Sequence, residues 1–157
     1  MFRFERDTLR ARPATAYAED RAIRFQDVDA AGIIFYPRLL EYCHDLLVRF
    51  FAENGAALPE VLREGNWLAP VRHAAVDYFK PLRFGDPVEI ALVSAHLSTS
   101  EVTLGFRVAR RDGSGEVCAV AQSVHTFVDA RTFTRIGLPE TLRVALEAIG
   151  DLARPSA

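Results

Sequence analysis

The chain has 157 residues, of which half are hydrophobic and a quarter are charged, and its formal net charge is -2 at pH 7. This length predicts a single domain over residues 1–157, with one hydrophobic core over about residues 15–130. A charge balance this even lacks the basic excess of nucleic-acid-binding proteins, so it argues against that class.

The cysteines and the N-terminus narrow the class of protein further. Cys43 and Cys118 have neither the spacing of a zinc site nor the density of a disulfide framework, so we expect two buried, reduced thiols and no metal. The N-terminal residues mix arginines with acidic residues and lack the apolar run of a signal peptide. No stretch approaches the roughly 18 apolar residues of a membrane span. We therefore predict a cytoplasmic protein with no membrane partner.

The first predicted elements are a strand, a turn and a long helix. Residues 15–26 have the composition of a strand, and the sequence DVDAAG that follows is typical of a turn. Pro37 suits the first position of a helix. Hydrophobic residues recur at helical spacing from Leu39 to Phe51 and leave only a narrow polar face. We predict a helix over residues 37–54 that other structure largely covers.

Most of the remaining chain is predicted to be strand. After the turn signals at Pro81 and Gly85, hydrophobic residues alternate cleanly with others from Val102 to Val108, and RDGSGE closes a hairpin. The predicted strands cover about 67–79, 87–97, 102–108 and 117–128, and a short helix covers about 138–150. Because strands and helices do not alternate after residue 55, we expect an α+β fold in which an antiparallel sheet of about five strands packs on one long helix.

The turn after the first strand carries the strongest candidate for chemistry. Asp29 lies seven residues before Tyr36, where the predicted helix begins. The unpaired amides of a helix N-terminus stabilise an oxyanion, and the possible donors are Tyr36, Arg38 and Leu39, of which we favour Tyr36. An ionised aspartate beside such a donor can attack a thioester or activate a water molecule. Asp27 competes for this role, because the sequence does not tell which of the two aspartates faces the helix.

The segment RFQDVDAAGIIFYPRLLEYCHD resembles the signature of hot-dog thioesterases of the 4-hydroxybenzoyl-CoA thioesterase type. The shared pattern is a strand, Asp-x-Asp-x-x-Gly, a hydrophobic pair, an aromatic pair and the helix. A second segment, LAPVRHAAVDYFKPLRFGDPVEI, is similar to the strands that follow in this family, particularly in 1,4-dihydroxy-2-naphthoyl-CoA thioesterases. The resemblance covers about Ala22 to Val128. It implies the hot-dog fold and the hydrolysis of an acyl-CoA, with a hydroxybenzoyl-like or dihydroxynaphthoyl-like acyl group.

The resemblance also assigns roles and partners. The catalytic aspartate of the family falls on Asp29, and its carbonyl-polarising backbone amide falls on Tyr36. Related hot-dog enzymes place a catalytic glutamate on the central helix, where Glu41 is the candidate. The family further implies a homodimer or homotetramer with active sites at the subunit interface. It implies no metal and no cofactor beyond the CoA of the substrate.

Aromatic residues are candidates for an acyl pocket, and basic residues are candidates for contacts with the phosphates of CoA. Core packing and solvated surface charge explain the same residues equally well. The acyl-pocket candidates are Phe35, Tyr36, Trp67, Phe79 and His73, and the phosphate candidates are Arg107, Arg110, Arg111 and Arg131 with Lys80 and Arg83.

Two other classes of protein compete with this interpretation. The sequence AIRFQDVDAAG also offers the strand and Asp-x-Asp of a haloacid dehalogenase phosphatase, but the alternating strands and helices of that fold are missing. A non-hydrolytic acyl-CoA binding protein or a dehydratase on the hot-dog fold is the second alternative, because a fold does not settle a function.

Overall fold

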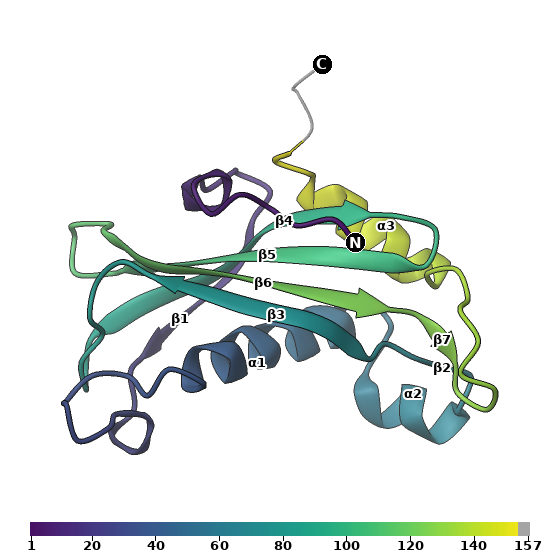
Figure 1. Ribbon diagram of the computed structural model, residues 1–157, viewed down its shortest axis with the longest axis horizontal. Coiled ribbons are helices and arrows are strands. Elements are labelled where there is room, and N and C mark those ends of the chain that lie inside the picture. Colours follow the sequence, from purple (N-terminus) through teal and green to yellow (C-terminus); the bar gives the residue numbers. More distant parts are fainter. Residues whose placement is uncertain (154–157) are drawn as a thin grey trace.

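The hydrophobic stripe after the DVDAAG turn forms the helix α1 (Arg38–Glu53), which lies along one face of a curved sheet in the computed structural model (Figure 1). The structure describes residues 1–153, so the last four residues of the predicted domain lie outside the described part. Buried α1 side chains form the centre of the core, and they are Leu39, Tyr42, Cys43, Leu46, Leu47, Phe50 and Phe51. The predicted helix is confirmed to within one residue at each end.

The sheet has five strands in the order β1-β4-β5-β6-β3, and every neighbouring pair is antiparallel. A separate pair of short strands joins β2 to β7. The bounds are β1 (Tyr17–Ala22), β2 (Trp67–Leu68), β3 (Val71–Tyr78), β4 (Pro87–Leu97), β5 (Glu101–Arg110), β6 (Val117–Thr126) and β7 (Val128–Asp129). The predicted α+β arrangement, a five-stranded antiparallel sheet packed on one long helix, is confirmed.

Two predicted strands are shorter than the sequence pattern indicated. The first ends at Ala22, where the partner strand β4 begins, and residues 25–27 form the short 3-10 helix η2 (Phe25–Asp27) instead. The stretch 67–79 is split into β2 and β3 around Pro70, because a proline has no amide to donate to the ladder.

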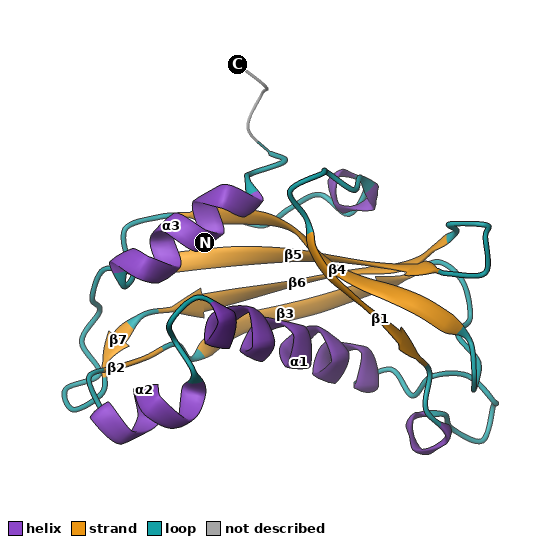
Figure 2. Ribbon diagram, turned by 180° about the vertical axis from the view of Figure 1, so that it is seen from behind, coloured by secondary structure: helices purple, strands orange, loops and turns teal. Residues whose placement is uncertain are grey.

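Two smaller helices complete the fold on either side of these strands. The helix α2 (Leu58–Glu64), which was not expected from the sequence patterns, follows α1 and ends at Gly65 in the left-handed conformation. The helix α3 (Glu140–Ile149) confirms the predicted C-terminal helix and packs beside β4. Figure 2 shows α1 and α2 lying against the same side of the sheet. None of the helices in residues 1–153 is long and apolar enough to cross a membrane.

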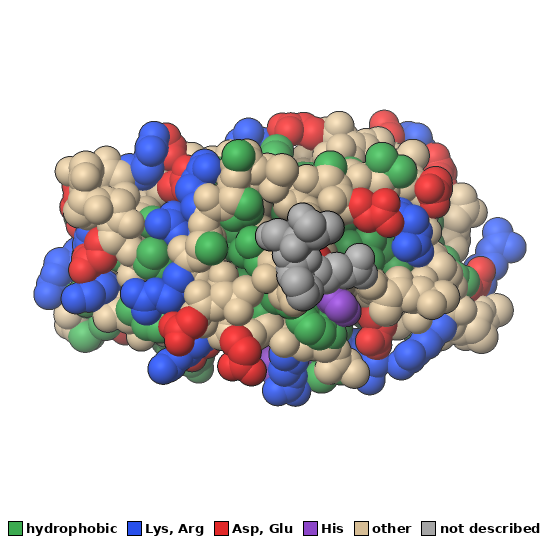
Figure 3. All heavy atoms as spheres, turned by 90° about the horizontal axis from the view of Figure 1, so that it is seen from above, with side chains coloured by type: hydrophobic (Ala, Val, Ile, Leu, Met, Phe, Trp, Pro, Cys, Tyr) green, Lys and Arg blue, Asp and Glu red, His purple; other side chains and the backbone are tan. Residues whose placement is uncertain are grey.

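The N-terminal segment covers the outer face of the sheet, opposite α1. Gly105 on β5 makes room for it, because a Cβ at this position would lie only 2.3 Å from Leu9 Cδ2. The side chain of Gln122 accepts a hydrogen bond from the Phe4 amide at 2.9 Å and donates one to the Phe4 carbonyl at 3.0 Å. In Figure 3, which views this side of the molecule, hydrophobic side chains lie among charged side chains of both signs. Both faces of the sheet are therefore covered by the chain itself.

Candidate active site

The two aspartates of the DVDAAG turn have different environments, and Asp27 is a buried structural carboxylate. Asp27 is only 1% exposed, and its Oδ2 accepts hydrogen bonds of 2.6 Å from both Arg24 Nε and the Tyr42 hydroxyl. Burial raises the pKa of Asp27, but the hydrogen bonds from Arg24 and Tyr42 outweigh burial and hold this pKa below its usual value. Asp27 thus fastens the turn to α1, and its burial keeps both carboxylate oxygens away from solvent.

Asp29 is exposed at the outer end of the same turn. Its Oδ1 accepts a hydrogen bond of 2.8 Å from the Ala31 amide, and its carbonyl accepts one of 2.9 Å from the Gly32 amide. Gly32 has a φ of 75°, a conformation that glycine adopts without strain. Within residues 1–153, Oδ2 of Asp29 has no hydrogen-bond partner. Of the two aspartates, only Asp29 presents an open carboxylate oxygen.

The Tyr36 amide at the start of α1 is an unused donor. The neighbouring amides of Phe35 and Arg38 bond to the carbonyls of Asp27 at 2.8 Å and Phe35 at 2.9 Å, but in the described part of the chain the Tyr36 amide has no acceptor. The Tyr78 hydroxyl on β3 donates to the Tyr36 carbonyl and so fixes the orientation of this region. Burial raises the pKa of Tyr78 to about 12, so the hydroxyl remains a donor. An open amide at the positive end of a helix suits an oxyanion.

A cavity of about 380 Å³ lies between α1, β3 and β6. Its lining includes a hydrogen-bonded pair, in which Ser123 Oγ lies 2.9 Å from His125 Nε2. The other polar residues of the lining are Glu41, His44, Asp45 and Gln122. His125 Nδ1 lies 3.2 Å from the Ala69 carbonyl, and since a carbonyl only accepts, the proton is on Nδ1 and Nε2 accepts from Ser123. Burial lowers the pKa of His125, which keeps the imidazole neutral at pH 7. The Ser123 oxygen therefore faces the cavity as an acceptor.

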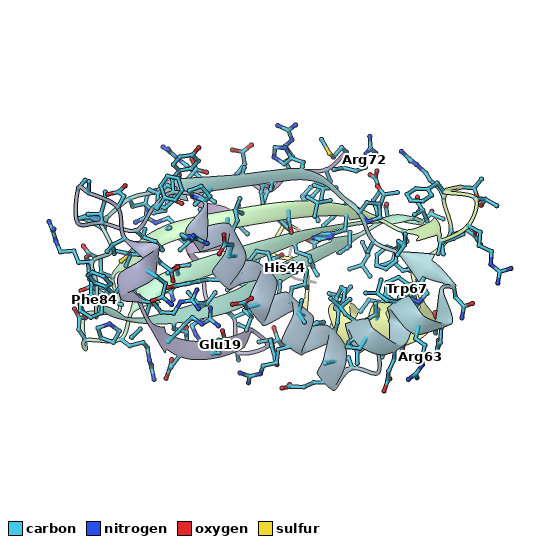
Figure 4. All side chains as sticks on the ribbon, turned by 90° about the horizontal axis from the view of Figure 1, so that it is seen from below. Glu19, His44, Arg63, Trp67, Arg72 and Phe84 are labelled. Atoms are coloured by element: carbon cyan, nitrogen blue, oxygen red, sulfur yellow. The ribbon has the colours of Figure 1, made fainter. Side chains whose placement is uncertain are left out.

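Two further cavities adjoin these groups. One of about 180 Å³ lies between α1 and α2, is lined by Trp67, and shares His44 and His125 with the larger cavity. Figure 4 shows His44 near the middle of α1 and Trp67 close to α2. Another cavity, of about 370 Å³, lies beside the start of α1 and is lined by Tyr36 and Tyr78. Cavities thus lie along α1 from its start to its junction with α2.

Of the predicted acyl-pocket residues, Tyr36, Trp67 and Phe79 each line one of these cavities, whereas Phe35 and His73 line none of the three. The rings of Phe35 and Tyr36 contact each other edge to face at 5.1 Å and are 42% and 70% exposed. Trp67 packs on the core residue Phe127 and lines the small cavity. Phe79 lies at the cavity beside Tyr36, and His73 lines none of the three cavities. The structure therefore brings Tyr36 and Phe79 together and leaves His73 apart from them.

The arginines predicted to contact phosphates are mostly occupied within the fold. Arg110 donates to Asp86 at 2.6 Å and to Glu116 at 3.2 Å. Arg107 donates to a backbone carbonyl and lies 3.7 Å from Glu89. A phosphate at either arginine would have to displace an acidic partner. Arg131 forms no ion pair within 4 Å in the described residues, but it follows β7, at the opposite end of the molecule from η2 (Figure 1).

The other candidates for chemistry are engaged or buried. Glu41 on α1 accepts two hydrogen bonds from Arg38, at 2.8 and 2.7 Å. Cys43 and Cys118 are buried free thiols, as predicted, and burial raises the pKa of Cys43 to about 12, so its thiol is no nucleophile. Within residues 1–153, no three His, Cys, Asp or Glu side chains form a group that could hold a metal ion.

No motif in the sequence indicates a role for the pair of Ser123 and His125. Their spacing of two residues on a strand places both side chains on one face of the sheet, and this is the only signal that the sequence offers. Their hydrogen bond and their position in a cavity under α1 depend on the three-dimensional fold.

Comparison with known proteins places these features in a family. The model of the thioesterase-like superfamily matches residues 23–146. The chain is 32% identical to a 1,4-dihydroxy-2-naphthoyl-CoA hydrolase of Synechococcus elongatus over 136 residues, which cover 86% of this chain and 98% of the relative. It is 30% identical to the hydrolase of the same name from Rippkaea orientalis over 122 residues, which cover 78% of this chain and 88% of that relative. The resemblance inferred from the sequence motifs is confirmed.

Solved structures agree with this placement. A 1,4-dihydroxy-2-naphthoyl-CoA thioesterase from Synechocystis superposes with a TM-score of 0.78 at 23% identity and covers 89% of this chain and 99% of its own. A gentisyl-coenzyme A thioesterase superposes with a TM-score of 0.70 at 26% identity and covers 82% of this chain and 98% of its own. The predicted hot-dog fold is therefore confirmed.

Proposed function

Because the chain belongs to the thioesterase-like superfamily, we propose that it hydrolyses the CoA thioester of an aromatic acid to the free acid and CoA. One observation carries this proposal: the open carboxylate of Asp29 stands in the turn that leads directly to the unbonded amide of Tyr36. The names of the relatives, dihydroxynaphthoyl-CoA hydrolase and gentisyl-CoA thioesterase, support an aromatic acyl group that carries hydroxyls.

In the proposed mechanism, the carbonyl oxygen of the thioester accepts a hydrogen bond from the Tyr36 amide. Negative charge grows on this oxygen as the carbonyl carbon is attacked, and the amide and helix dipole stabilise it. Asp29 either attacks the carbon and forms an anhydride that water then hydrolyses, or takes a proton from a water molecule that attacks. Both routes expel the CoA thiolate, need the same ionised carboxylate, and use no metal or cofactor.

The cavity under α1 is the proposed site of the acyl ring. It lies along the helix that begins next to Tyr36, and its volume of about 380 Å³ is in the range of small-molecule pockets. Ser123 Oγ already donates its proton to His125, so it is left to accept a hydrogen bond from a hydroxyl on the ring.

A panel of CoA esters tests both the function and the acyl site. We expect the chain to release thiol from dihydroxynaphthoyl-CoA and hydroxybenzoyl-CoA with a higher kcat/KM than from benzoyl-CoA. Ser123→Ala should reduce this preference about tenfold, because a hydrogen bond in a desolvated site contributes about 1–2 kcal/mol. Ser100→Ala, which removes a serine hydroxyl outside the three cavities, is the matched control and should keep the preference. A medium-chain fatty acyl-CoA as the best substrate would contradict the acyl assignment.

The proposed enzyme is a homodimer or a homotetramer. The edge strand β3 pairs with β6 on one side and has no partner strand on its other side among the described residues. A long free edge favours pairing with another chain, and two β3 edges would join two sheets beside the α1 helices. Light scattering should give a mass at least twice the 17.5 kDa of one chain. A fully active monomer at the assay concentration would contradict this assembly.

A further inference from the structure

We propose that Arg83, together with the exposed aromatic pair Phe25 and Phe84, binds the phosphorylated nucleotide end of CoA. This inference rests on the proposed function, because it states how the CoA part of the substrate is held. The site lies at the turn between β3 and β4, where that turn meets the loop that carries Asp29.

Backbone hydrogen bonds fix these two loops against each other. The Ile34 amide donates to the Leu82 carbonyl at 2.8 Å, and the Gly85 amide donates to the Ile23 carbonyl at 2.9 Å. Arg83 lies in the sequence between these two hydrogen-bonded residues, and its own amide donates to the Asp86 side chain at 2.8 Å. The turn that carries Arg83 therefore has a fixed position relative to the loop of Asp29.

The guanidinium of Arg83 has no acidic partner among residues 1–153. A Cβ placed on Gly32, in the same turn as Asp29, would lie 4.0 Å from Arg83 Nη1. In the part of the chain that the structure describes, the Arg83 side chain has neither a hydrogen bond nor an ion pair. The nearby cations differ in this respect, since Arg24 is bonded to Asp27 at 2.6 Å and Lys80 lies 3.3 Å from Glu116. Arg83 can therefore pair with a phosphate without first losing an acidic partner.

The residue that follows Arg83, Phe84, belongs to an exposed aromatic pair. Phe25 and Phe84 are 71% and 62% exposed, and their rings contact each other edge to face with centroids 5.7 Å apart. Core packing does not explain two large apolar rings that remain this exposed. Stacking of bases on aromatic rings, combined with basic groups that bind phosphates, is one way in which proteins hold nucleotides. Together the three residues fit the adenine ring and a phosphate of CoA.

The surrounding hollows give the rest of the substrate a path. The cavity of about 370 Å³ is lined by Ile33, Tyr36 and Pro81, so it lies between the turn of Arg83 and the start of α1. The pantetheine arm, which links the phosphates to the thioester, fits this position. In this arrangement the thioester lies at the Tyr36 amide. The nucleotide lies at Arg83 on the surface, and the acyl ring lies in the cavity under α1.

Free CoA and paired thioesters test the site. We expect Arg83→Gln to weaken the binding of free CoA, measured by calorimetry, and to raise KM for an aromatic acyl-CoA, each about tenfold, with kcat unchanged. The pantetheine thioester of the same acid lacks the nucleotide, so its KM should not change. Phe84→Ala should weaken CoA binding several-fold. The matched control is Arg63→Gln, because Arg63 is an exposed arginine on α2, at the opposite end of the molecule from Phe84 (Figure 4).

The outcomes separate this site from the proposed function. If Arg83→Gln binds free CoA as tightly as the wild type, or if Arg63→Gln weakens binding equally, the nucleotide site is wrong even when the enzyme turns over. If Arg83→Gln raises KM for the pantetheine thioester as much as for the CoA thioester, Arg83 acts on the turn of Asp29 and does not bind the nucleotide. If the wild type binds CoA in an Arg83-dependent way but hydrolyses neither thioester, the site stands and the hydrolytic function fails.

Discussion

Replacing Asp29 with asparagine should lower kcat at least about a hundredfold and leave the fold unchanged. Asparagine has the same shape and can still accept the hydrogen bond from the Ala31 amide through Oδ1, so the turn keeps its conformation. It carries no negative charge and can neither attack the thioester carbon nor take a proton from water. Steady-state thiol release from an aromatic acyl-CoA measures the loss, and the melting temperature checks the fold.

Asp112→Asn is the matched control for this variant. Asp112 is also exposed, and its Oδ1 also accepts a backbone hydrogen bond within a turn, from the Ser114 amide at 3.0 Å. It lies at the tip of the β5–β6 hairpin and has no place in the proposed chemistry. Equal losses of kcat in both variants would show that the effect of Asp29→Asn is unspecific.

The second large effect is expected on stability, from Asp27→Asn. The change removes the charge that Arg24 pairs with and weakens the acceptor of the buried Tyr42 hydroxyl, so the free energy of unfolding at pH 7 should fall by about 2 kcal/mol. Tyr42→Phe removes only the hydroxyl and should cost about 1–2 kcal/mol. Urea unfolding of the two single variants and the double variant measures the coupling between these residues.

The difference in stability between the wild type and Asp27→Asn should depend on pH, because the pKa of Asp27 is lowered in the folded chain. A carboxylate whose pKa is lower in the folded chain than in the unfolded chain stabilises the fold above the unfolded pKa, which is about 3.9. This contribution is lost as the pH falls through the folded pKa, where Asp27 becomes neutral like asparagine. The wild type and Asp27→Asn should therefore converge in stability in acid. An unchanged difference at low pH would contradict the charge-based account.

The sequence predicted the parts of the fold that depend on local patterns. The stripe from Leu39 to Phe51 could only be buried as a helix, and the turn residues before Pro87 marked the start of β4. The N-terminal segment was different, because the outward residues of β5 do not reveal which distant segment covers them. The contact between Leu9 and Gly105 is made by the tertiary fold and has no counterpart in the periodicity.

In the candidate site too, local sequence patterns predicted some features, and others depend on the tertiary fold. Spacing left Asp27 and Asp29 as candidates for the catalytic carboxylate, and the family resemblance favoured Asp29. The burial of Asp27 against Tyr42 is consistent with that choice, and the sequence does not show it. The basic residues were indistinguishable in the sequence, because their partners are distant in the chain, as Asp86 is for Arg110. Arg83 differs from the nearby cations Arg24, Lys80 and Arg110 in having no acidic partner among the described residues, and only the fold reveals this difference.

The most direct test of the account is thiol release from dihydroxynaphthoyl-CoA by the wild type and by Asp29→Asn, side by side in a buffer that contains a metal chelator. We expect steady turnover by the wild type and a loss of at least about a hundredfold in kcat for Asp29→Asn. Absence of turnover by the wild type, or equal rates for the two proteins, would contradict hydrolysis by the Asp29 carboxylate at the start of α1.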